Sequence, residues 1–285
     1  MSFHFELRQY WLLLAALTAT LHISMVALSQ HNDNLVLLAL IAWAGALLCI
    51  EDQLPSLTLK PSPTSLLLGA TLLAWSFWRI SIIQDLDGMA WLLPTLMGLA
   101  LTWLARPLRQ ASGWLAALAA LAMLPLSHLF LAALPESVLS PLTARLSQLL
   151  LMLAGNDVVV NGRQILLPGG AVVVGAQCSG NWMMAQSLMI ACIFALAFPL
   201  PRQRSLPLLL LSSCVIAWVV NVIRILSLAV INASTMASKS WWFEFVHDGA
   251  GSLMFSGLAV SLYGWLYLQW LQRQLLQLER SNPDA

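Results

Sequence analysis

The sequence predicts an all-α polytopic membrane protein with about eight transmembrane helices, and a small extracytoplasmic amphipathic helix and β-hairpin before the helix that begins near Cys178. Three observations predict this class. The 285 residues are 60% hydrophobic and 9% charged, whereas about a quarter of the residues in a soluble domain are charged. Hydrophobic runs close to the ~20 residues that cross a bilayer recur along the chain. The cations cluster in alternate connections between these runs, as in membrane proteins.

Each hydrophobic run is interpreted as one span. The runs cover roughly 10–30, 35–50, 66–83, 89–105, 114–134, 181–199, 206–231 and 249–271. The second and fourth are short. The first follows Arg8 as a signal peptide would, but no small-residue cleavage site comes after it, so we expect it to be retained as a helix.

The distribution of cations predicts the orientation, because positively charged residues favour cytoplasmic connections. The connections assigned to the cytoplasm hold Arg8, Lys60, Arg106, Arg109, Arg202, Arg204, Arg273 and Arg280, and the outer ones hold Arg145, Arg163 and Lys239. We therefore expect a multi-pass protein of the inner (plasma) membrane with both termini in the cytoplasm. The few, scattered charges exclude a nucleic-acid-binding surface.

Four segments follow from this topology. They are the N-terminal transmembrane helices at 1–134 (about five spans), an extracytoplasmic segment at 135–177, a core of three transmembrane helices at 178–272 and a cytoplasmic tail at 273–285. Within the second segment, leucines at steps of three or four from Leu139 to Leu150 predict an amphipathic helix at the outer interface. The β-branched clusters that follow are separated by Asn161-Gly162 and Gly169-Gly170, which predicts a β-hairpin.

Cys178 follows this hairpin at the predicted start of the sixth span. At that place, backbone amides and the positive end of the helix dipole would lower the pKa of a thiol and make it a better nucleophile. The alternative is a small packing residue, the interpretation preferred for Cys49, Cys192 and Cys214 inside hydrophobic runs. A disulfide to Cys178 is not expected, because no other cysteine lies on the predicted outer face.

The topology brings three polar residues to the membrane depth of this cysteine. Asn221 and Arg224 share one face of the seventh span, and His247 comes just before the eighth. A guanidinium and an imidazole beside a thiol supply charge stabilisation and proton transfer. Each has an ordinary alternative as well: Arg224 as an interfacial anchor or the ion-pair partner of Glu244 or Asp248, and His247 as an interfacial histidine without chemistry.

Three motifs together resemble the exosortase/archaeosortase family: Cys178-Ser179-Gly180, Asn221-Val-Ile-Arg224-Ile225 and His247-Asp248-Gly-Ala-Gly251. The stretch "GNDVVVNGRQILLPGGAVVVGAQ" before the cysteine is also similar to the family's, so the resemblance covers about 138–265. It implies a membrane-embedded cysteine transpeptidase that cleaves C-terminal sorting signals of the PEP-CTERM type from exported, membrane-anchored proteins. Many relatives have an acidic residue two positions before the cysteine, where this chain has Ala176, and this departure bears on the subfamily.

The resemblance implies catalytic roles for Cys178, Arg224 and His247 on the extracytoplasmic face. The Cys178 thiolate would attack the peptide carbonyl and form a thioester, and Arg224 would stabilise the oxyanion or orient the substrate. His247 would protonate the leaving amine and activate the incoming nucleophile. The supporting or substrate-binding positions are Asn221, Ser179, Gly180 and Asp248. The place of Asp248 directly after His247 argues against direct contact between their side chains.

No metal or other cofactor is expected, because the chain has neither HExxH or paired CxxC spacing nor a glycine-rich nucleotide loop. Two alternatives to the transpeptidase stay open. One is a multi-span transporter or channel in which Arg224 and His247 line a path. The other is an enzyme of different reaction type, either a purely hydrolytic membrane protease or an acyltransferase that uses Cys178.

Overall fold

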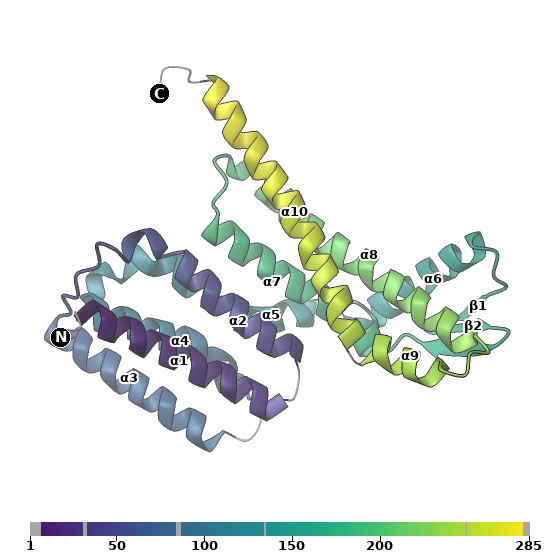
Figure 1. Cartoon of the computed structure of the whole chain (residues 1–285), viewed down its shortest axis with the longest axis horizontal. Coiled ribbons are helices and arrows are strands. Elements are labelled where there is room, and N and C mark those ends of the chain that lie inside the picture. The colour runs from purple at the N-terminus through teal and green to yellow at the C-terminus, as the bar shows by residue number, and fades with distance from the viewer. Residues whose placement is uncertain (1–6, 31–32, 84–86, 134, 249, 282–285) are drawn as a thin grey trace, which may run out of the picture. The chain divides into compact units, whose positions relative to one another are not determined.

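The structure, a computed structural model, describes residues 7–30, 33–83, 87–133, 135–248 and 250–281 (Figure 1). Most of this part is helical, with one three-stranded sheet. By its internal contacts the chain divides into two units, Met1–Leu126 with Cys192–Pro199, and Ser127–Ala191 with Leu200–Ala285. Among the described residues, six helices are long and apolar enough to cross a membrane, which confirms the all-α polytopic class expected from the sequence.

The first unit contains the N-terminal helices. They are α1 (Leu7–Gln30), α2 (Asp33–Leu48), α3 (Pro63–Ile82), α4 (Gly88–Ala105) and most of α5 (Leu115–Ala133), with short 3-10 helices at Glu51–Gln53 and Leu108–Trp114. A Cβ at Gly69 would lie 2.9 Å from the Ala100 carbonyl oxygen, so glycine permits the close approach of α3 and α4. Leu73 and Met97 are buried beside this contact.

The second unit contains the segments in which the sequence predicts a site. They are α6 (Glu136–Leu153), β1 (Val159–Asn161), β2 (Gln164–Leu167), β3 (Gly170–Val173), the 3-10 turn η3 (Ala176–Cys178), the start of α7 (Asn181–Ala197), the turn η4 (Gln203–Ser205), α8 (Leu206–Ala233), α9 (Lys239–His247) and α10 (Ala250–Ser281). In Figure 1 these elements run from teal through green to yellow.

In the described part of the chain, each of the eight predicted spans coincides with a helix over most of its length. The short apolar helices are α2 and α7, so the second span is short as predicted, whereas the fourth, α4, has the 18 residues of a full candidate span. The last helix extends beyond its predicted end at 271, because α10 continues through Ser281. Residues 273–281 of the expected tail are therefore helical, and 282–285 lie outside the described residues.

The predicted β-hairpin is present and is extended to an antiparallel meander of three strands in the order β1-β2-β3. Its tight turn after β1 uses Gly162 at φ +61, a conformation that favours glycine. The second turn lies against the end of α8: a Cβ at Gly170 would lie 2.6 Å from the Asn232 carbonyl oxygen. The Asn232 side chain donates a hydrogen bond to the Ala171 carbonyl at 2.6 Å. The sheet is thereby fixed on the C-terminal end of α8.

The predicted amphipathic helix is α6, and its polar face is the buried one. Ser140, Thr143 and Ser147 are fully buried, whereas Leu142 and Leu149 are 47% and 54% exposed. Helices that pack within a bilayer place small and polar residues against protein and apolar residues toward lipid. The exposed leucines of α6, which are Leu142, Leu149 and Leu150, therefore suit contact with hydrocarbon, whereas Leu139 is buried and the hydroxyl face packs against the rest of the unit.

Candidate functional site

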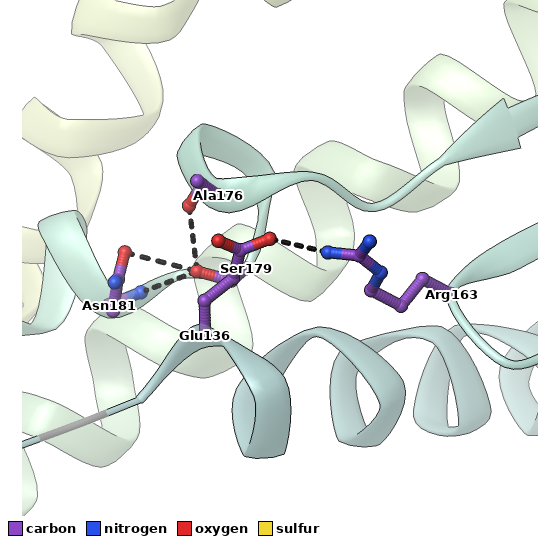
Figure 2. A network of polar contacts seen from close by, with 5 residues as sticks. All are labelled: Glu136, Arg163, Ala176, Ser179 and Asn181. Atoms are coloured by element: carbon purple, nitrogen blue, oxygen red, sulfur yellow. Dashed lines mark hydrogen bonds and ion pairs between the residues drawn. The ribbon is translucent and has the colours of Figure 1, made fainter.

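Cys178 lies in a tight turn between the sheet and α7. Its amide donates a hydrogen bond to the Gly175 carbonyl at 3.0 Å, and the residue is 4% exposed. The Ser179 hydroxyl lies 2.8 Å from the Ala176 carbonyl oxygen and 3.0 Å from Asn181 Oδ1 (Figure 2). The turn thus holds the thiol at a fixed place ahead of the helix.

The expectation that a helix N-terminus lowers the pKa of the Cys178 thiol is wrong. The helix begins only at Asn181, and its first amides bond to side chains: Asn181 N–H donates to the Ser179 hydroxyl at 3.4 Å and Trp182 N–H to Asn181 Oδ1 at 2.7 Å. Burial raises the pKa of the Cys178 thiol; the nearby Arg224 charge opposes this rise and the Asp248 charge adds to it. The resting thiol is therefore favoured over the thiolate.

Gly180 is required by conformation and by packing. Its φ is +94, and a Cβ at this position would lie 3.0 Å from Asn221 Nδ2 and 3.2 Å from Trp218 Cδ1. The absent side chain lets the turn approach α8 closely enough for the Asn221 amide to donate a hydrogen bond to the Cys178 carbonyl at 2.9 Å. Asn221 is 1% exposed. It therefore ties the segment that carries the cysteine to α8.

Arg224, one turn further along α8, makes hydrogen bonds to the segment that carries His247. The guanidinium Nε donates to the Val246 carbonyl at 3.1 Å, and Nη2 donates to the His247 carbonyl. These carbonyls belong to the C-terminal end of α9, where the helix dipole favours a cation. Arg224 is 6% exposed, so it is a buried clamp and does not act as a snorkelling interfacial anchor.

The two tied segments bring Cys178 and His247 into contact. Sγ lies 3.6 Å from Nε2, a hydrogen-bond distance for sulfur. On the other side of the ring, Nδ1 lies 2.7 Å from Asp248 Oδ2. Phe243 stacks on the imidazole with ring centroids 5.5 Å apart and planes 12° apart. The expectation that neighbouring positions keep Asp248 from contacting His247 is wrong, because the chain leaves the helix at Asp248 with φ −119 and its carboxylate turns back to the ring.

A thiol, an imidazole and a carboxylate therefore follow one another, with the imidazole within hydrogen-bond reach of each of the other two groups. In this order a carboxylate fixes the ring, and the far ring nitrogen accepts the proton of the nucleophile. The His247 and Asp248 side chains are 30% and 67% exposed, so the proton acceptor has access to solvent. The arrangement suits nucleophilic attack by sulfur followed by acid–base catalysis at the ring.

Thr143 and Trp218 are structural residues of the site that the sequence did not single out. The Thr143 hydroxyl donates to the Ser179 carbonyl at 2.9 Å, and Trp218 Nε1 donates to Thr143 Oγ1 at 2.9 Å. A second tie joins the β1–β2 turn to the start of α6 through an Arg163–Glu136 ion pair at 2.7 Å (Figure 2). The sequence did contain a pattern that could have indicated Thr143, because Ser140, Thr143 and Ser147 recur at helical spacing on one face of α6.

Within the part of the chain that the structure describes, no group of three or more His, Cys, Asp and Glu side chains is placed to hold a metal ion. The four cysteines are all free thiols. The site is thus assembled from side chains of η3, α8 and α9 with the Asp248 that follows α9.

Comparison with known protein families gives a match to the transmembrane exosortase model over residues 28–264. The match contains Cys178, Asn221, Arg224, His247 and Asp248. Comparison with curated proteins and with solved structures gives no match.

Proposed function

The chain belongs to the transmembrane exosortase family of membrane-embedded cysteine transpeptidases, and from this premise we propose that it cleaves C-terminal sorting signals of exported proteins with Cys178 as nucleophile. The contact between Cys178 Sγ and His247 Nε2 at 3.6 Å carries the proposal. The Asp248 carboxylate on the opposite ring nitrogen supports it, because this contact orients the ring.

The first half of the reaction forms a thioester. Because the Cys178 thiol is neutral at rest, His247 Nε2 takes its proton as the sulfur attacks the substrate carbonyl carbon. The carbon–sulfur bond forms and the carbonyl oxygen becomes an oxyanion. As this intermediate collapses, the carbon–nitrogen bond breaks and the protonated ring gives its proton to the leaving amine.

In the second half, an incoming nucleophile replaces the sulfur. His247 accepts the proton of an amine or of water, the new bond to the carbonyl carbon forms, and the sulfur leaves and is protonated by the ring. An amine acceptor gives transfer and water gives hydrolysis. The same residues serve both outcomes, and the two are distinguished by the mass of the new C-terminus.

Arg224 has a positioning role and an electrostatic role. Its bonds to the Val246 and His247 carbonyls hold the ring toward the cysteine, and its charge favours the thiolate. We assign the Arg224 guanidinium to the substrate oxyanion, where a cation in a water-poor site is strongly stabilising. A path-lining role in a transporter has less support, because Arg224 is buried and bonded to main-chain carbonyls.

The proposed substrate has a recognition motif, a hydrophobic span and a basic tail, of the PEP-CTERM-like kind. Exposed apolar side chains near the site, including Leu142 of α6 and Trp241 and Trp242 of α9, suit a location at the membrane interface. With the cation distribution along the chain, this favours a site on the extracytoplasmic face of the inner membrane. A substrate anchored by its own span would then present its cleavage point at the same depth.

Co-expression with a reporter that ends in a sorting signal from the source genome tests the proposal. Processing should be lost in Cys178→Ala, Arg224→Ala and His247→Ala at matched abundance in the membrane. Cys214→Ala is the matched control, because Cys214 is also a buried free cysteine of the same unit, and it should process normally. If Cys178→Ala processes the reporter as fast as the wild type, the nucleophile is another group and the proposal fails.

A further inference from the structure

A polar cavity lies in the same unit, far along α8 from Cys178. Its volume is about 760 Å³, and its lining includes Arg202, Arg204, Ser205, Trp270, Arg273 and Gln274. These residues come from the turn before α8 and from the C-terminal part of α10. The helices α8 and α10 pack together (Figure 1). Asn221 follows Ser205 by sixteen residues, which places the cavity about 24 Å along the helix from the cysteine turn.

The wall of the cavity is held by a defined hydrogen-bond network. Gln274, 7% exposed, accepts a hydrogen bond from Arg202 N–H at 2.8 Å and donates one to Ser205 Oγ at 2.9 Å. Trp270 Nε1 donates to the same hydroxyl at 3.0 Å. The turn is therefore attached to α10 by partly buried contacts, and Arg202 and Arg204 lie on a backbone that these contacts hold in place.

The charge of the lining is entirely positive. Three arginines, Arg202, Arg204 and Arg273, contribute guanidinium groups, and none of the lining residues is acidic. Among the arginines, Arg202 Nη1 donates a hydrogen bond to Gln277 Oε1 at 3.4 Å. The start of α8 adds the positive end of a helix dipole. This combination of guanidiniums, amides and a helix N-terminus favours an oxyanion with several acceptor atoms.

We propose that this cavity binds a phosphate group, either that of an anionic phospholipid headgroup or soluble phosphate. Arginine forks match the paired oxygens of phosphate, and Trp270 is a residue type enriched at headgroup depth. The distance of about 24 Å from the catalytic turn approaches the thickness of the hydrocarbon core. The cation distribution assigns this end to the cytoplasmic side, where basic pockets between helices bind anionic headgroups. The proposal does not depend on the peptidase chemistry.

The test is binding to the purified full-length protein. Native mass spectrometry measures association with phosphatidylglycerol and, as a neutral-headgroup comparison, phosphatidylcholine; thermal unfolding with added inorganic phosphate measures the soluble source. The variants are Arg204→Gln, Arg273→Gln and their combination. Arg109→Gln is the matched control, because Arg109 is an exposed arginine assigned to the same membrane side and does not line the cavity. Arg204→Lys retains the charge and checks that the site itself stays intact.

The expected result is a loss of about fivefold in phosphatidylglycerol association for each arginine removed, with no loss in Arg109→Gln and a smaller loss in Arg204→Lys. If inorganic phosphate stabilises the wild type and this stabilisation is lost in the same variants, the proposal stands with soluble phosphate as the source. If the double variant binds phosphatidylglycerol as the wild type does and phosphate stabilises neither protein, the proposal is overturned. Equal association with phosphatidylcholine, whose phosphate is neutralised by its choline cation, together with no stabilisation by inorganic phosphate would overturn it as well, because the net negative charge of the headgroup would then play no part.

Discussion

Cys178 is subject to opposing influences that together set its reactivity. Burial disfavours the thiolate, Arg224 favours it and Asp248 disfavours it, and the pKa of the thiol is raised as a result. The nucleophile is thus inactive until the neighbouring imidazole takes its proton. A membrane enzyme that must not react with unrelated electrophiles benefits from this arrangement, since the thiolate forms only where His247 is correctly placed.

The raised pKa predicts how the thiol reacts with an alkylating reagent. With the other three cysteines replaced by alanine, the iodoacetamide rate of Cys178 should stay low through neutral pH and rise only above the usual thiol pKa of about 8.5. Because Arg224 lowers the pKa of this thiol, Arg224→Gln should move the rise to higher pH. Arg145→Gln, at an exposed arginine of α6, is the control. A rate that reaches its plateau below pH 7 would contradict the raised pKa.

The contact of Asp248 with His247 predicts that Asp248 positions the imidazole ring for catalysis. Asp248→Asn should lower the rate of reporter processing by about tenfold, a modest part of the acid–base contribution because the carboxylate is exposed. Asp248→Glu should recover part of the loss, which a merely structural role would not predict. Glu244→Gln changes an exposed acid of α9, the helix that precedes Asp248, and should have no effect. Equal rates for Asp248→Asn and Glu244→Gln would remove Asp248 from the mechanism.

At the scale of elements, the sequence predicted which segments form but not every contact. Hydrophobic runs and β-branched clusters located the helices and the sheet, because these patterns reflect local backbone preferences. The face that α6 buries was not predictable in this way, since a leucine stripe faces protein in water and lipid in a bilayer. The Asp248–His247 contact depends on the backbone angles at the end of α9, which sequence spacing does not determine.

The attachment of the sheet to α8 predicts a strong effect from a single methyl group. In Gly170→Ala the new Cβ would lie 2.6 Å from the Asn232 carbonyl oxygen, a backbone atom that cannot rotate away. The variant should be destabilised by about 1–3 kcal/mol, measured by thermal unfolding in detergent, and should process the reporter more slowly. Gly257→Ala meets nothing within 4 Å and is the control. An unchanged unfolding temperature for Gly170→Ala would show that the close approach of sheet and helix is wrong.

At the scale of the whole molecule, the proposed function requires Cys178 and His247 to lie on the outer side of the membrane. The turn that carries Arg202 and Arg204 is expected on the cytoplasmic side. The start of α8 and the loop after it are separated by a helix of 28 residues, which is about 42 Å long and exceeds the hydrocarbon thickness of ~30 Å. The cations at Arg202 and Arg204 favour the cytoplasm for the first of these ends. Membrane insertion should therefore hold the two ends apart.

Single cysteines introduced at these two ends test this orientation. In a background without native cysteines, Met236→Cys should react with a membrane-impermeant maleimide added to intact cells, whereas Gln203→Cys should react only after the membrane is opened. Both positions are exposed in the structure, so a difference in labelling reports the side of the membrane. The reverse pattern would put Cys178 and His247 on the cytoplasmic side, where a substrate exported across the membrane would no longer reach them, and the proposed function would fail with the orientation.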